Sequence, residues 1–179
     1  MIVRDRMLSQ KVPGVVGTLM SNLGLERKLN ELGVEFVRAQ VGDRYVLEQL
    51  RQRNWHYGGE SSGHILCLDN HTTGDGIIAA LQILTALRHH QCTLAELVAD
   101  LSMYPQHMEN ISWEQGRDWT TCAPLVQAKE RVEAQLGEQG RVLIRPSGTE
   151  PKLRIMVEAE DTALLKQAMS TLLDATNKM

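Results

Sequence analysis

The chain has 179 residues, of which 42% are hydrophobic and 23% are charged, a composition typical of a globular, core-forming protein. Its formal net charge of −3 and the absence of a long apolar run argue against a nucleic-acid partner and against a membrane partner. The three cysteines, Cys67, Cys92 and Cys122, are widely spaced and form no CxxC pair, which predicts reduced thiols in a cytoplasmic protein.

The N-terminal part of the chain shows an alternation of strands and helices. The pattern predicts a helix over 2–8, a strand over 14–19, a helix over 24–32, a strand over 34–39, a helix over 45–52 and a strand over 65–68. Asp43 is expected to cap the helix at 45–52, and Asp75 a long apolar helix at 76–89. Thr93 and Glu96 form a capping-box pattern, which we expect to open a shorter helix that runs through Leu101. Because the first helix begins without a cap, we expect the sequence to come from a longer polypeptide.

The pattern changes around Pro105. The sequence then predicts a strand over 108–113, a helix over 124–136, two strands around a polar loop, and a helix over 163–176 capped by Asp161. We therefore predict two domains. An α/β domain with a mixed sheet and helices spans 1–106, and a smaller α+β domain spans 107–179.

A loop rich in phosphate-binding groups lies between two apolar runs near the C-terminus. It reads Arg145-Pro146-Ser147-Gly148-Thr149-Glu150-Pro151-Lys152-Leu153-Arg154. Arg145 and Arg154 can bind a phosphate through bidentate contacts. Ser147 and Thr149 supply hydroxyls, and backbone N–H groups can form an anion-binding nest around Gly148, which we expect to have a positive φ. The loop therefore predicts a phosphate site, with a plain solvated hairpin turn as the alternative.

A second polar loop lies between strand-like runs in the first domain. It reads Gly59-Glu60-Ser61-Ser62-Gly63-His64. Glu60 and Ser62, two residues apart, can point to one side of extended backbone and bind neighbouring sugar hydroxyls. Histidine side chains have an unperturbed pKa of about 6.5, so a histidine at position 64 suits proton transfer or contact with a phosphate. The alternatives are a plain connecting loop and a histidine that only fixes the shape of the loop.

Asp69, His71 and Asp75 lie close together in sequence and could be read as metal ligands. Their spacing fits no standard site, and each has an explanation as a turn or capping residue. We therefore predict no metal site in this chain.

The two loops resemble, in sequence and in order, the signature loops of the α-D-phosphohexomutase family. RPSGTEPxxR is similar to the phosphate-binding loop of that family, and GExSGH is similar to its sugar-binding loop. The stretches 16–22, 41–46 and 72–76 resemble the corresponding stretches of the family members that act on amino sugars. A Lys near Gly17 and a His near Asp43, which we would expect in the glucose and mannose branch, are absent.

The resemblance implies the fold of the third and fourth family domains. It implies an enzyme that interconverts glucosamine 6-phosphate and glucosamine 1-phosphate through a sugar 1,6-bisphosphate, with Mg²⁺, for amino-sugar metabolism and peptidoglycan precursors. It assigns two groups of residues. The sugar would be bound by Asp43, Arg44, Glu60, Ser62 and His64, with His64 also a candidate for catalytic proton transfer. The non-transferring phosphate would be bound by Arg145, Ser147, Gly148, Thr149 and Arg154.

Two parts of the family's machinery do not occur in this sequence. Neither a phosphoserine loop nor an Asp-rich Mg²⁺ loop is found, and phosphoryl transfer needs both a nucleophile and metal-assisted charge neutralisation. We therefore expect this chain alone to be inactive and to work with the N-terminal domains of the same enzyme on a phosphorylated amino sugar. The alternatives are a non-catalytic sugar-phosphate binding module and a relative of the phosphomannomutase or phosphoglucomutase type.

Overall fold

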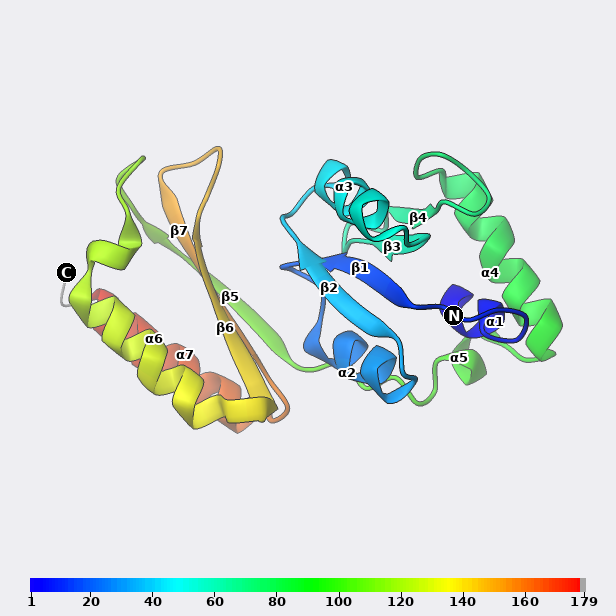
Figure 1. Ribbon diagram of the computed structural model, residues 1–179. Coiled ribbons are helices and arrows are strands. Elements are labelled where there is room, and N and C mark those ends of the chain that lie inside the picture. The colour runs from blue at the N-terminus through cyan, green and yellow to red at the C-terminus, as the bar shows by residue number, and fades with distance from the viewer. Residues whose placement is uncertain (178–179) are drawn as a thin grey trace. The chain divides into compact units, whose positions relative to one another are not determined.

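The computed structural model describes residues 1–177, which divide into two compact units (Figure 1). The first unit ends at Ser102 and the second begins at Met103. Strand β5 starts at Gln106, so a boundary between residues 106 and 107 would separate that residue from the rest of the strand.

The first unit is built on a four-stranded mixed sheet of order β2-β1-β3-β4. Its strands are β1 (Gly14–Thr18), β2 (Glu35–Ala39), β3 (Tyr57–Gly59) and β4 (Ile65–Cys67). Strand β1 is parallel to β2 and β3, whereas β3 and β4 are antiparallel. The predicted α/β domain with a mixed sheet is confirmed, but the three-residue strand β3 was not predicted. This strand joins the parallel and the antiparallel parts of the sheet.

Helices cover both faces of this sheet. They are α1 (Ile2–Arg6), α2 (Leu23–Glu31), α3 (Asp43–Arg53), α4 (Gly76–His90) and α5 (Leu94–Leu97). Val15 packs with Leu29 of α2 on one face, while its neighbour Val16 packs with Val46 and Leu50 of α3 on the other. Successive side chains of a strand point to opposite faces, so β1 supplies both cores. Figure 1 shows α3 on one side of the sheet and α1 and α2 on the other.

The predicted caps of three helices are confirmed, whereas the predicted cap of α3 and the predicted end of α5 are wrong. Asp75 caps α4, Asp161 caps helix α7 (Thr162–Thr176) of the second unit, and Thr93 forms a capping box with the first turn of α5. Asp43 is not a cap, because the N-cap of α3 is Gly42, whose φ of 127° suits glycine, and Asp43 is the first helical residue. Helix α5 ends at Leu97 rather than at Leu101.

We expect Asp75→Ala to destabilise the protein by about 1 kcal/mol, the usual size of an N-cap loss. The Oδ1 atom of Asp75 accepts hydrogen bonds from the N–H groups of Ile77 and Ile78, both at 2.9 Å. Urea unfolding followed by circular dichroism measures the change. Asp75→Asn keeps the capping oxygen and should lose much less stability; an equal loss in both variants would contradict the capping explanation.

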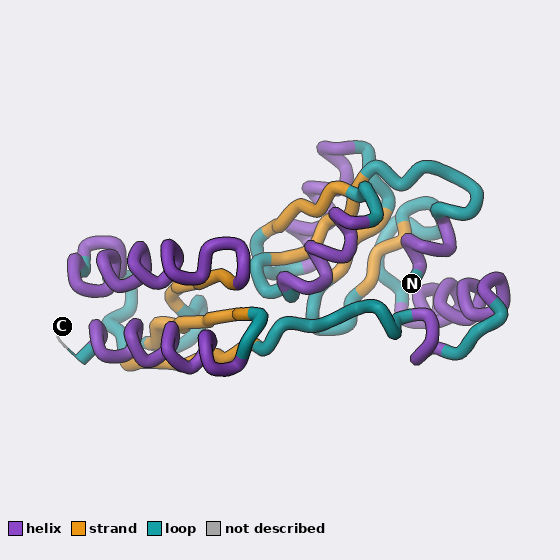
Figure 2. The backbone as a smooth tube through the Cα atoms, turned by 90° about the horizontal axis from the view of Figure 1, so that it is seen from below, coloured by secondary structure: helices purple, strands orange, loops and turns teal. Residues whose placement is uncertain are grey.

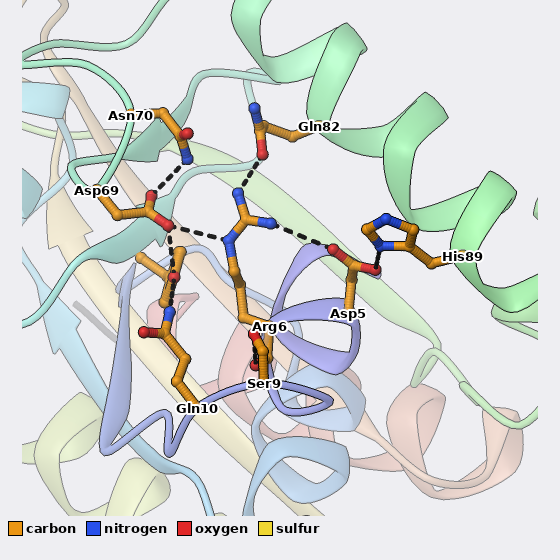
Figure 3. Close-up of polar contacts among 9 residues, drawn as sticks. Asp5, Arg6, Ser9, Gln10, Asp69, Asn70, Gln82 and His89 are labelled. Atoms are coloured by element: carbon orange, nitrogen blue, oxygen red, sulfur yellow. Dashed lines mark hydrogen bonds and ion pairs between the residues drawn. The ribbon is translucent and has the colours of Figure 1, made fainter.

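A network of polar side chains fixes α1 to the end of β4 and to α4 (Figure 3). Arg6 donates from Nε to Asp69 Oδ2 at 2.9 Å and also donates to Gln82 of α4. Asp5 is only 4% exposed, and its Oδ1 lies 2.7 Å from Nδ1 of His89. Asp69 lies just after β4, so the network also anchors the strand that follows the polar loop at 59–64.

The second unit is a smaller α+β structure, as predicted. Its antiparallel sheet has the order β5-β7-β6, formed by β5 (Gln106–Ser112), β6 (Gly140–Pro146) and β7 (Lys152–Ala159). Its helices are α6 (Ala123–Leu136) and α7 (Thr162–Thr176), with short 3₁₀ turns at Trp119–Thr121 and Gly137–Gln139. Figure 2 shows both long helices along one face of the sheet, where a single hydrophobic core forms. The central strand β7 is almost completely buried, so it provides a rigid support for the loop that precedes it.

Within residues 1–177 no helix is both long and apolar enough to cross a membrane.

Candidate functional site

The loop at 59–64 is a tight turn between the antiparallel strands β3 and β4. The Glu60 N–H donates to the His64 carbonyl at 3.0 Å, and the Gly63 N–H donates to the Glu60 carbonyl at 3.1 Å. The Ser62 hydroxyl donates to Glu60 Oε1 at 3.1 Å, so the two side chains do lie together. The tight turn brings them together, rather than the extended backbone that we had expected.

The carboxylate of Glu60 also binds the start of helix α3. Its Oε2 accepts a hydrogen bond from the backbone N–H of Gly42 at 3.1 Å. The N-terminus of a helix carries a partial positive charge, which favours a carboxylate there. Each carboxylate oxygen has two lone pairs, so Glu60 is oriented by the protein and can still accept hydrogen bonds from a ligand.

The turn and the start of α3 bring the predicted sugar-binding residues into one region. His64 Nδ1 lies 3.9 Å from Asp43 Oδ2, while His64 Nε2 is buried and has no hydrogen-bond partner among the described residues. A Cβ atom built on Gly74 would lie 1.6 Å from His64 Nε2, so any other residue at this position would require the ring to move. Arg44 stacks over the ring of Tyr45, with its Cζ atom 4.8 Å from the ring centre.

The predicted phosphate loop joins β6 to β7 and is organised around one hydroxyl. Ser147 is 8% exposed, and its Oγ accepts from the N–H groups of Thr149 at 3.5 Å and Glu150 at 3.3 Å. Gly148 does not have the positive φ that we expected, so that prediction is wrong. A Cβ built on Gly148 would still meet no atom within 4 Å, and the loop is open at this point.

The two arginines of this loop lie opposite each other on β6 and β7. Burial and the neighbouring charge of Arg154 lower the pKa of Arg145 from its ordinary value. The side chain of Arg145 forms no hydrogen bond or ion pair with any described residue, and Nε of Arg154 is buried without a hydrogen-bond partner. Arg154 Nη2 lies 3.4 Å from Ser147 Oγ. Two like charges with unused donors, beside an open loop, form a site to which an anion can bind.

The residues that we rejected as metal ligands have structural roles. Asp69 accepts hydrogen bonds from Tyr57 at 2.8 Å and from Arg6, and Asp75 caps α4. Burial raises the pKa of Asp69, but these hydrogen bonds outweigh burial and bring the pKa below its usual value. His71 Nδ1 lies 3.2 Å from a carbonyl oxygen of its own turn. Residues 1–177 contain no group of three or more His, Cys, Asp or Glu side chains arranged to bind a metal ion.

Sequence reasoning did not identify three residues that shape these two sites. Gly42 contributes a backbone N–H donor to Glu60, and Gly74 leaves space for the His64 ring. No local sequence pattern connects either glycine to the 59–64 turn. Glu150 was part of the recognised motif but received no role. Only the structure shows that the Glu150 carboxylate pairs with both Lys152 and Arg154.

Models of phosphohexomutase domains match nearly the whole chain. The model of phosphoglucomutase/phosphomannomutase α/β/α domain III matches residues 1–104, and the model of the C-terminal domain matches residues 108–175. The chain therefore belongs to the phosphoglucomutase/phosphomannomutase family.

The curated relatives that are similar in sequence include phosphoglucosamine mutases. A phosphoglucosamine mutase of Bordetella pertussis is 64% identical over 174 residues, which are 97% of this chain and 38% of that protein. A phosphoglucosamine mutase of a Janthinobacterium species is 58% identical over 160 residues, or 89% of this chain and 36% of that protein. The chain thus spans well under half the length of these relatives.

Solved structures support the same fold. The N-acetylphosphoglucosamine mutase of Aspergillus fumigatus, in complex with GlcNAc-6P and magnesium, has a TM-score of 0.76 and 18% identity, and the match covers 98% of this chain and 44% of that one. A putative phosphomannomutase of Thermus thermophilus has a TM-score of 0.60 and 21% identity, and the match covers 99% of this chain and 38% of that one.

Proposed function

We propose that this chain is the substrate-binding part of a phosphoglucosamine mutase, which interconverts glucosamine 6-phosphate and glucosamine 1-phosphate through a sugar 1,6-bisphosphate. The observation that carries the proposal is the pair of opposed arginines with unused donors at the Ser147 loop. The likeness to phosphoglucosamine mutases over 97% of the chain supports the choice of substrate class.

Each site has its own role in this proposal. In the first unit, Glu60 and Ser62 bind sugar hydroxyls, beside Asp43, Arg44 and His64, and His64 is a candidate for proton transfer. In the second unit, the non-transferring phosphate is bound by the side chains and backbone of a single loop, namely Arg145, Ser147, Gly148, Thr149 and Arg154. The nucleophilic serine and the Mg²⁺ ligands belong to other domains of the same cytoplasmic enzyme, and a metal ion there would neutralise charge on the transferring phosphate.

A phosphate titration of the isotopically labelled chain tests this proposal. Because every donor of the phosphate site lies in one hairpin, we expect weak binding without other domains, with a dissociation constant of about 1 mM after the cost of desolvation and ordering. The amide signals of Ser147, Gly148 and Thr149 should shift first. If these signals stay still while signals elsewhere move, the hairpin is not the phosphate site.

A further inference from the structure

The phosphate loop contains a carboxylate that faces its own cations. Glu150 Oε1 lies 2.9 Å from Lys152 Nζ, and Oε2 lies 3.4 Å from Arg154 Nη2. The backbone of Glu150 is held on both sides, because its N–H donates to Ser147 Oγ and its carbonyl accepts from the Lys152 N–H at 2.8 Å. The hairpin therefore holds the backbone of Glu150 close to these two cations.

The two arginines of the loop differ in this respect. Arg154 has Glu150 as a counter-ion, whereas Arg145 has none among the described residues. The contact between Arg154 and Glu150 is longer than a good charge-assisted hydrogen bond, which measures about 2.7–2.9 Å. Its two partners are 30% and 45% exposed, so water and salt weaken the pair. A ligand that offers Arg154 shorter contacts can replace Glu150.

We propose that Glu150 is an internal counter-ion of the phosphate site, which holds Arg154 while the site is empty and weakens the binding of a phosphate group. The inference rests on the proposed function, because it concerns the same site. Its physical basis is competition for one guanidinium, together with repulsion between a carboxylate and a phosphate. The carboxylate is ionised at neutral pH, since the contacts with Lys152 and then with Arg154 lower the pKa of Glu150. The proposed consequence is a site that binds the phosphate group of a sugar phosphate and releases it readily.

The variant Glu150→Gln tests this inference in the labelled chain, with inorganic phosphate as the probe at pH 7.5. We expect the dissociation constant to fall by about two- to fivefold, the range of an exposed ion pair. Glu160→Gln is the matched control. Glu160 is an exposed carboxylate just beyond β7, so this variant changes the net charge equally and should leave phosphate binding unchanged.

Glu150→Gln removes the ion-pair partner of Lys152 as well as that of Arg154. A second pair of variants therefore distinguishes an effect through Arg154 from an effect through Lys152. The effect of Glu150→Gln is measured again in the background of Lys152→Met. A gain that persists there supports the competition at Arg154, and a gain that disappears overturns it.

The outcomes distinguish this inference from the proposed function. If the unchanged chain binds phosphate at Ser147, Gly148 and Thr149 but Glu150→Gln binds equally or more weakly, the counter-ion role is wrong and the phosphate site stands. If the unchanged chain does not bind phosphate there, the proposed function of the loop fails, and the counter-ion role fails with it.

Discussion

We expect Glu60→Ala to lower kcat/KM for glucosamine 6-phosphate about a hundredfold in a full-length enzyme that carries this sequence, because a misplacement of about 1 Å at a reacting centre can have that effect. The Glu60 carboxylate is held from two sides, by the Gly42 N–H and by the Ser62 hydroxyl. Under the proposed function, an oriented acceptor of this kind would fix the direction of the sugar hydroxyls. Steady-state kinetics measure the loss in both kcat and KM.

The control for this prediction comes from the same turn. Ser61 is exposed and makes no side-chain hydrogen bond with a described residue, so Ser61→Ala should have nearly unchanged kinetics. Glu60→Gln keeps one carbonyl acceptor and should lose less activity than Glu60→Ala. Wild-type kinetics for Glu60→Ala would exclude the turn from the sugar site.

The parts of the fold that depend on local signals could be predicted from the sequence. Asp75, Asp161 and Thr93 are caps whose partners lie within three residues, so a linear pattern contains all the information. The apolar run at 14–19 predicted a buried strand, and β1 is buried along its whole length. Strand β3 was missed because its three residues, Tyr57-Gly58-Gly59, include two glycines and show no alternation.

The geometry of the first candidate site depends on contacts between distant residues. The hydrogen bond from Gly42 to Glu60 crosses 18 positions, and the place of Gly74 beside the His64 ring follows from the path of the loop after β4. Such contacts result from the packing of α3 and the loops against the sheet, so they could not be predicted from the spacing of residues in the sequence. Asp43 was predicted as a cap because Asp is favoured at that position, but Gly42, with a φ of 127°, is the cap and Asp43 is the first residue of α3.

The second candidate site was easier to predict because it is contained in a single hairpin. Arg145 and Arg154 became neighbours as soon as two strands and a short loop were assigned. What the sequence did not predict is which hydrogen bonds and ion pairs the polar groups of the loop make with one another. The Ser147 hydroxyl accepts hydrogen bonds from backbone N–H groups of the loop, and Gly148 does not have the positive φ that was expected. The Glu150 carboxylate pairs with Lys152 and Arg154.

We expect Arg145→Met to weaken phosphate binding by this chain about ten- to a hundredfold, because a charge-assisted contact contributes about 1.5–3 kcal/mol. Arg145 has no counter-ion among the described residues, and burial and Arg154 already lower its pKa, so its charge is unfavourable in the folded protein. Removing that charge should therefore leave Tm unchanged or raise it, while binding is lost. Lys152→Met is the matched control, because it removes the same charge from the same hairpin but should change binding at most about threefold. Phosphate titration by NMR and thermal unfolding measure the two effects. Equal losses of binding in both variants would show that the loop attracts phosphate only by its net charge, and a large fall in Tm for Arg145→Met would show that this arginine stabilises the fold instead.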